Sequence, residues 1–134
     1  EGRYLDYLKS IAKPNVTFYG RVSDEALRDQ YSGALAFIYP QVEDFGLMPL
    51  EAASCATPTV ALAKAGSLET VVHGQTGELL ETFDQATLSE SLKRVRNHVY
   101  QPEVMQAHAA KFSQDRFKQE ISQFVIQTYY AHHS

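Results

Sequence analysis

The sequence has little of what several classes of protein require. Among its 134 residues there is one cysteine, Cys55, which excludes an internal disulfide and a thiolate metal cluster. Twelve lysines and arginines against sixteen aspartates and glutamates give a net charge of -4, whereas a duplex-DNA binder needs a basic face. No apolar run is long enough to cross a bilayer, and there is no internal repeat or low-complexity tract. What remains, with 44% apolar and 21% charged residues, is the composition of one folded globular domain.

The beginning of the chain also lacks two common features. It opens at Glu1 rather than at a methionine, and no cationic stretch followed by an apolar one marks a secretory leader. We therefore expect the chain to be a piece of a longer polypeptide. The single cysteine fits a reducing compartment, so we expect a cytoplasmic location, with a peripheral position at the inner face of the membrane as the alternative.

Helical and extended patterns alternate along the chain. Short β-branched, aromatic or apolar runs predict strands at 16–19, 34–39, 59–63 and 78–81. Helical spacing and capping residues predict helices at 2–13, at 24–33, from Gly46 or Leu47 onward, at 67–72, after Asp84, from Pro102 and after Ser113. The runs at 34–39 and 59–63 are apolar without alternation, which is typical of parallel strands buried on both faces. The pattern predicts an α/β fold, a doubly wound parallel sheet with helices on both faces, in which the last three helices form a bundle-like cover.

The loop after the second expected strand is the most informative segment. In a parallel sheet, ligands bind at the carboxyl ends of the strands, where loops lead into helices. A helix that starts near Gly46 presents unpaired N–H groups and the positive end of its dipole, which together form an anion site. A glycine there places no side chain between a phosphate and the backbone. Glu43 precedes the helix, and Glu51 follows its start by about one turn, roughly 6 to 8 Å.

Two carboxylates beside an anion site indicate a particular kind of ligand. Like charges near a bound phosphate are unfavourable unless the ligand offers them hydroxyl groups or an electropositive carbon. A nucleotide sugar offers both, because it carries ribose hydroxyls, a diphosphate and an anomeric carbon that becomes cationic during transfer. The sequence therefore predicts a nucleotide-sugar site between Glu43 and Glu51.

The same residues carry a resemblance to a known family. Glu43 and Glu51, with Phe45, Gly46 and Leu47 between them, resemble the E-x7-E signature of retaining GT-B glycosyltransferases, and the resemblance is closest to the large family called group 1 or family 4. Further segments follow in family order, at 16–27, 57–61, 65–72, 74–77 and 112–129, so that nearly the whole chain is covered. The resemblance implies the C-terminal, Rossmann-like donor-binding half of a GT-B fold, lacking its first two strands and ending in a helical tail.

The resemblance also implies an activity and the residues that perform it. A hexose would pass from a nucleoside-diphosphate sugar to a hydroxyl group of a glycan or a lipid-linked acceptor, without a metal or another cofactor. Glu43 would be the catalytic residue at the reaction centre, and Glu51 would hold the ribose hydroxyls. Backbone N–H groups would face the sugar or the diphosphate at Phe45, Gly46 and Leu47. The base would contact mainly the backbone of the loop formed by Gly20, Arg21 and Val22.

The sequence departs from the family pattern at several points. Ala56 stands where the family usually has glycine, and if that position needs a left-handed backbone, alanine costs on the order of 1 kcal/mol. Ala65 and Gly66 stand where two glycines are common. No counterpart of the family's first two strands precedes Glu1, so we expect residues 1–134 to form a single, incomplete domain that is inactive alone. Its unpaired sheet edges would favour self-association or a strand swap. Its last helix, about 112–134, would pack on a missing N-terminal domain.

Three alternatives remain open from the sequence. A non-catalytic nucleotide-sugar-binding module, or one subunit of a split enzyme, would share the donor site, and co-purification with a partner chain would favour it. A GT-B-type sugar-nucleotide epimerase would bind the same donor, and the E-x7-E spacing is the main feature that separates it from a transferase. A receiver or flavodoxin-like regulatory domain is disfavoured. Receivers need an aspartate at the end of a central strand, and the expected strands end at Tyr19, Tyr39 and Ala63.

Overall fold

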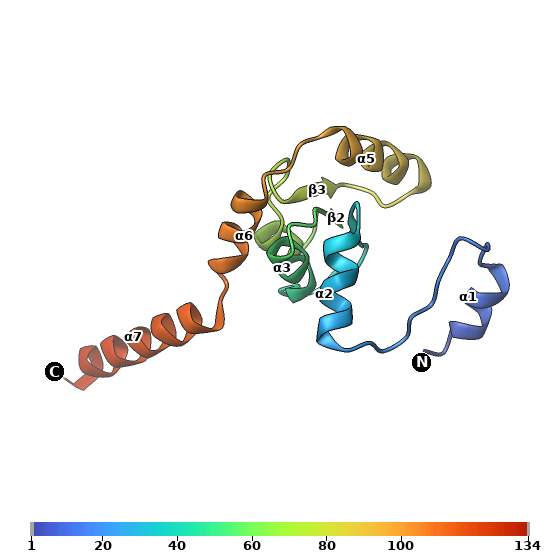
Figure 1. The fold of residues 1–134 in the computed structure, drawn as a ribbon. Coiled ribbons are helices and arrows are strands. Elements are labelled where there is room, and N and C mark those ends of the chain that lie inside the picture. The colour runs from blue at the N-terminus through green and yellow to red at the C-terminus, as the bar shows by residue number, and fades with distance from the viewer. Residues whose placement is uncertain (1, 134) are drawn as a thin grey trace.

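The computed structural model describes residues 2–133 of the chain, and its helices and strands alternate along most of that length (Figure 1). The helices are α1 Leu5–Ile11, α2 Asp24–Gly33, α3 Leu47–Ser54, α4 Ser67–Thr70, α5 Gln85–Asn97, α6 Pro102–Ala110 and α7 Gln114–His133. The strands are β1 Phe37–Tyr39, β2 Thr59–Leu62 and β3 Gly77–Leu80. They form one parallel sheet in the order β1-β2-β3.

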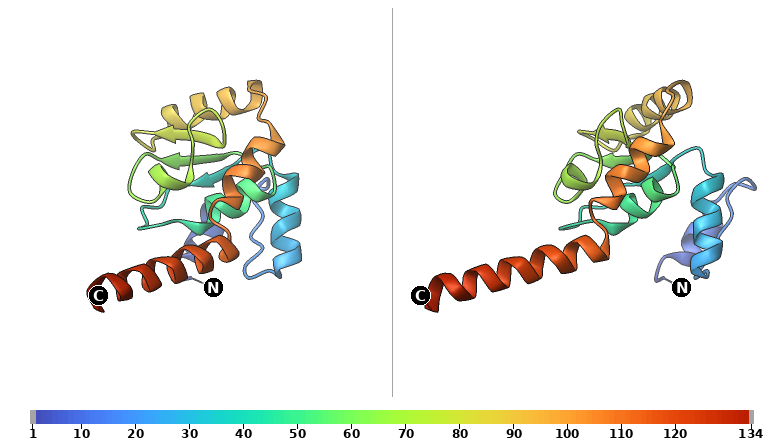
Figure 2. Two further views of the ribbon diagram at one scale, coloured as in Figure 1. Left: turned by 90° about the vertical axis from the view of Figure 1, so that its left-hand side faces the viewer. Right: turned by 60° about the vertical axis from the view of Figure 1, so that its left-hand side comes forward.

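Helices cover both faces of this sheet. On one face, Val60 and Leu80 pack against Val95 of α5. On the opposite face, Tyr39 and Ala61 pack against Val71, which directly follows α4, and α3 and α6 lie on the same side (Figures 1 and 2). Neighbouring residues of a strand point to opposite faces, which is why Val60 and Ala61 belong to different core clusters. The expectation of an α/β fold with a parallel sheet between helices is confirmed.

The helix starts follow the capping residues in the sequence. The side-chain oxygens of Ser23, Asp84 and Ser113 accept hydrogen bonds from the N–H groups of Ala26, Thr87 and Arg116, over 3.3, 2.9 and 3.4 Å respectively. Each bond satisfies an N–H group that has no partner within its own helix. Capping is a local interaction, and this is why the sequence predicted these three helix starts.

The expected strand at 16–19 is wrong. These residues are not part of a strand in the structure, and three of their side chains are exposed: Val16 by 48%, Phe18 by 39% and Tyr19 by 61%. A β-branched and aromatic run becomes a strand only where a neighbouring strand accepts its backbone hydrogen bonds. The sheet formed by residues 2–133 consists of β1, β2 and β3, so the outer edge of β1 is unpaired and no strand lies beside 16–19.

The ends of several other elements also differ from expectation. The second expected strand starts at Phe37 rather than at residue 34. Ala34 instead caps the end of α2, because its N–H group donates to the carbonyl of Tyr31 over 3.0 Å. The first helix and α4 are each shorter than predicted, at Leu5–Ile11 and Ser67–Thr70.

The last helix does not cover the sheet. Whereas α6 packs against α3 and buries Met105, α7 extends away from the rest of the chain (Figures 1 and 2). Phe117, Ile121 and Phe124 on α7 are 64%, 41% and 64% exposed. The expectation of a bundle of three helices is therefore wrong for α7, because an apolar period predicts a helix but not the surface on which it packs. No helix within residues 2–133, α7 included, is both long and apolar enough to pass through a membrane.

Candidate functional site

The loop between β1 and α3 turns sharply at Gly46. Gly46 has a φ of +79°, in the left-handed region that favours glycine, and it caps the N-terminus of α3. A Cβ at this position would lie 3.3 Å from the hydroxyl oxygen of Tyr39, so glycine also leaves room for that side chain. Because α3 begins at Leu47, as expected, the first N–H groups of the helix have no intrahelical partner.

Glu43 is held at both its backbone and its side chain. Its carbonyl oxygen accepts a hydrogen bond from the N–H group of Gly66 over 2.9 Å. Its Oε2 atom accepts a second one from the Tyr39 hydroxyl, over 2.7 Å. The carboxylate is otherwise exposed to solvent. Glu43 therefore occupies a defined position beside the start of α3 while remaining accessible to a ligand.

Gly66 packs directly against the backbone of Phe45. A Cβ at position 66 would lie 2.2 Å from the carbonyl oxygen of Phe45 and 2.5 Å from its Cα, closer than real Cβ atoms approach. Only glycine allows this contact, which presses the start of α4 against the loop that carries Glu43. The sequence analysis noted Gly66 as a family position, but only the tertiary contact reveals that it supports the site.

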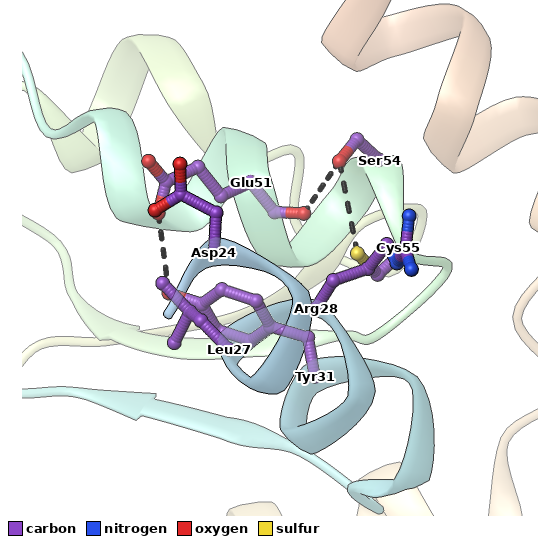
Figure 3. A pocket seen from close by; sticks show the side chains of 7 residues that line it. All are labelled: Asp24, Leu27, Arg28, Tyr31, Glu51, Ser54 and Cys55. Atoms are coloured by element: carbon purple, nitrogen blue, oxygen red, sulfur yellow. Dashed lines mark hydrogen bonds between the residues drawn. The ribbon is translucent and has the colours of Figure 1, made fainter. Parts of the chain in front are cut away.

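Glu51 lies one turn into α3 and faces α2 (Figure 3). Its Oε2 atom accepts a hydrogen bond of 3.4 Å from the hydroxyl of Tyr31, a residue of α2. Glu51 lines a cavity of about 320 Å³ between the two helices, together with Asp24, Leu27, Arg28, Tyr31, Ser54 and Cys55. It also borders a second cavity of about 490 Å³ between α3 and α6. Glu51 therefore borders two cavities, and its carboxylate lies on the α2 side, beside Tyr31.

An aromatic row connects the two glutamates. The Phe37 ring lies 5.3 Å from that of Tyr31 and 5.7 Å from that of Tyr39, measured between centroids. Burial is the main factor that raises the pKa of Tyr31 and the pKa of Tyr39, each to about 12, and the nearby glutamates raise both further. Both hydroxyls thus remain protonated at neutral pH and act as donors. The sequence analysis missed this row, because it treated these aromatic residues only as parts of core elements.

Phe45 and Leu47 flank the start of α3 with exposed side chains. The Phe45 ring lies 5.8 Å from that of Phe112, and both residues line a cavity of about 560 Å³ with Leu47 and Phe117 at the junction of α6 and α7. Their side chains therefore face the end of α6. Any role of their backbone N–H groups toward a diphosphate stays a prediction.

The loop of Gly20, Arg21 and Val22 lies apart from the start of α3. Gly20 and Arg21 line a cavity of about 900 Å³ with Leu5 and Lys9 of α1. In Figure 1, this N-terminal segment lies beyond α2, on the side away from α3. The structure thus brings Glu43, Gly46 and Phe45 together, and places Glu51 one turn away, but it does not bring residues 20–22 to them.

Ala56, directly after α3, has a left-handed backbone with a φ of 60°. The N–H of Thr57 donates to the carbonyl of Ala52 over 2.9 Å, a bond typical of a helix end that is completed by a left-handed residue. The sequence analysis made the cost of alanine here conditional on this conformation, and that condition is met. Ala65 is left-handed as well, with a φ of 47°.

Replacing Ala56 with glycine is expected to raise the free energy of unfolding by about 1 kcal/mol, because glycine adopts this conformation without strain. Urea denaturation followed by circular dichroism measures the change. Ala107→Gly is the matched control: Ala107 lies in the exposed middle of α6, where glycine should cost about 1 kcal/mol. Two variants that shift the midpoint in the same direction would contradict this account.

Within the described part of the chain, no group of three or more histidine, cysteine, aspartate and glutamate residues is placed to hold a metal ion.

Comparison with known proteins relates the chain to one family. A family model described as "Glycosyl transferases group 1" matches residues 4–112. The chain is 28% identical over 117 residues to "Capsular polysaccharide biosynthesis glycosyltransferase CapM" of Staphylococcus aureus, which covers 87% of the chain and 30% of the relative. It is 32% identical over 126 residues to "Alpha-1,3/1,6-mannosyltransferase ALG2" of Mus musculus, covering 87% of the chain and 29% of the relative.

A third relative is "D-inositol 3-phosphate glycosyltransferase" of Geodermatophilus obscurus, with 35% identity over 104 residues, 74% of the chain and 22% of the relative. The chain therefore spans less than a third of the length of each of these three proteins. The family match, in contrast, extends from the residue before α1 to the residue before Ser113 and includes both glutamates of the site. On this match and on its parallel α/β fold, the chain belongs to the group 1 family of glycosyl transferases.

Proposed function

We propose that this chain binds the donor of a retaining glycosyl transfer, a nucleoside-diphosphate hexose. The protein passes the hexose to a hydroxyl group of a glycan or a lipid-linked acceptor. The observation that carries the proposal is the pair Glu43 and Glu51 on either side of the first turn of α3, each hydrogen-bonded to a tyrosine hydroxyl. Membership of the group 1 family supports glycosyl transfer as the class of reaction.

The hexose, the diphosphate and the ribose of the donor each have a chemically matched group at this site. Glu43 faces the hexose, where its carboxylate supports the hydroxyls and the positive charge that develops at the anomeric carbon. The N–H groups at Phe45, Gly46 and Leu47 and the helix dipole of α3 stabilise the leaving diphosphate without a metal ion. Glu51 accepts hydrogen bonds from the ribose hydroxyls. The base is assigned to the loop of residues 20–22 on the family resemblance alone.

The acceptor class rests on what the relatives are called. One is named for capsular polysaccharide biosynthesis and another for mannosyl transfer. The first name concerns a polysaccharide, and the second concerns the transfer of mannose through specified linkages. They support a glycan or a lipid-linked sugar as the acceptor of this protein.

A donor screen tests the proposal. Isothermal titration calorimetry on the full-length protein, with UDP-glucose, UDP-galactose, GDP-mannose, ADP-glucose and dTDP-glucose, should identify at least one ligand. Glu51→Ala should weaken its binding by about 10- to 100-fold, because a hydrogen bond to a charged group is lost.

The control is Glu90→Ala. Glu90 is an exposed glutamate on α5, the helix on the opposite face of the sheet, where it pairs with Lys93. Its removal should leave donor affinity unchanged. Failure of every donor to bind would refute the proposed function. Equal affinities of Glu51→Ala and the unsubstituted protein would refute the ribose role of Glu51.

A further inference from the structure

The aromatic row of Tyr31, Phe37 and Tyr39 is more deeply buried than Glu43 and Glu51, the two glutamates to which its tyrosines donate hydrogen bonds. Tyr31 is 5% exposed and Tyr39 is 1% exposed, whereas both carboxylates reach the solvent. The rings contact one another through Phe37. The ring of each tyrosine is therefore held in the core, and its hydroxyl group reaches the carboxylate of a glutamate at the surface.

Tyr39 is the more constrained of the two. Its hydroxyl donates to Glu43 over 2.7 Å and lies directly under Gly46, where a Cβ would come within 3.3 Å of it. The N–H group of Gly66 fixes the backbone of Glu43 through its carbonyl oxygen. The hydrogen bond from the Tyr39 hydroxyl then fixes the direction of the Glu43 side chain. The residue connects the end of β1, the side chain of Glu43 and the first turn of α3.

Tyr31 makes the corresponding contact to Glu51 from a different element. Its hydroxyl donates to Glu51 over 3.4 Å, a longer and weaker bond than that of Tyr39. Its backbone carbonyl accepts a hydrogen bond from the hydroxyl of Thr57, which fixes this end of α2 to the segment before β2. The two hydroxyls thus hold the two glutamates from one connected group of rings.

We propose that Tyr39 is a positioning residue, which fixes the Glu43 carboxylate for its role at the reaction centre, and that Tyr31 does the same for Glu51. This inference rests on the proposed function, because it takes the roles of the two glutamates from it. A glutamate on an open loop samples several rotamers, and a misplaced catalytic group loses much of its effect. The buried hydroxyl restricts the carboxylate without covering the side that faces the ligand.

Kinetics of the full-length protein test the inference, with hydrolysis of the tightest-binding donor of the screen as the readout: water accepts the hexose, and the released nucleoside diphosphate is measured. Tyr39→Phe keeps the ring and removes only the hydroxyl. It should lower kcat about tenfold and leave the donor KM within about twofold, because Glu43 acts on the reacting sugar. Tyr31→Phe should instead raise the donor KM about threefold at unchanged kcat, because Glu51 binds the ribose.

The control is Tyr100→Phe. The hydroxyl of Tyr100 is buried and makes no hydrogen bond to the part of the chain that the structure describes, and its ring packs on the α5 face of the sheet. This variant should leave both kcat and KM unchanged. This control shows whether the kinetic changes come from losing the hydrogen bond to a glutamate or from removing any buried tyrosine hydroxyl.

A double-mutant cycle separates positioning from mere stabilisation of the fold. In a Glu43→Ala background, Tyr39→Phe should change kcat by less than about twofold, because there is no carboxylate left to position. A Tyr39→Phe enzyme with unchanged kcat, or one with the same tenfold loss in both backgrounds, would overturn the positioning role alone. Unchanged turnover in Glu43→Ala itself would overturn the role of Glu43 in the proposed function, and with it the inference.

Discussion

Gly66→Ala is expected to lower the free energy of unfolding by about 3 kcal/mol, at the upper end of what overpacking costs. The added Cβ would lie 2.2, 2.4 and 2.5 Å from the carbonyl oxygen, carbonyl carbon and Cα of Phe45. These are backbone atoms, so no rotamer change relieves the overlap. Either α4 or the loop at 43–45 has to move, and chemical denaturation measures the cost.

The same substitution should also impair the site. The N–H group of Gly66 donates to the carbonyl of Glu43, so a displaced backbone weakens that bond together with the packing against Phe45. Donor affinity in the calorimetric screen should fall along with stability.

Gly33→Ala is the matched control for this substitution. Gly33 is the last residue of α2 and has nothing within 4 Å of the Cβ that would be added. Alanine there should be neutral or stabilise the protein by up to about 1 kcal/mol. If the two variants have the same stability, the close contact between Gly66 and Phe45 is wrong.

Arg94→Ala is also expected to destabilise the protein by about 3 kcal/mol, through an unpaired buried charge. The Nε atom of Arg94 on α5 lies 2.7 Å from Oε2 of Glu78, whose side chain on β3 is only 7% exposed. Without Arg94, the carboxylate remains beneath α5 and loses the cation that pairs with it. The side chain of Arg94 is itself 52% exposed, which is why we expect the lower end of the range measured for buried pairs.

Two further variants test whether the destabilisation comes from the buried, unpaired Glu78 carboxylate or from the loss of an ion pair as such. Glu78→Leu combined with Arg94→Leu should recover most of the lost stability, since apolar residues of similar size often replace a buried pair without loss. Arg116→Ala breaks the pair of Arg116 and Glu120 on α7, whose side chains are 49% and 61% exposed, and should cost no more than about 0.5 kcal/mol. Equal costs for Arg94→Ala and Arg116→Ala would contradict the burial argument.

The sequence predicted those parts of the fold that depend on neighbours in the chain. The caps Ser23, Asp84 and Ser113, and the start of α3 after Gly46, all involve groups a few residues apart. At Ala56, where the family usually has glycine, the sequence analysis made the cost of alanine conditional on a left-handed backbone, and the structure has that backbone. The residues of the candidate site were likewise chosen from spacing and from the family resemblance.

The errors concern partners that are distant in the sequence. The run at 16–19 has the residue types of a strand but no strand beside it, and α7 has an apolar face that the rest of residues 2–133 does not cover. The roles of Tyr39 and Gly66 were missed for the same reason. Their importance lies in contacts to Glu43 and Phe45, and residue type gives no sign of those contacts.

The sequence by itself determined the order of helices and strands from α2 onward, most helix starts, and the family whose signature the two glutamates resemble. Only the tertiary structure decided which tyrosine holds which glutamate, that the start of α4 supports the loop of Glu43, and that residues 20–22 lie away from α3. The physical reason is the range of the interactions. Helix caps and periodicity act over a few residues, whereas a hydrogen bond from Tyr31 to Glu51 exists only after segments twenty residues apart have packed together.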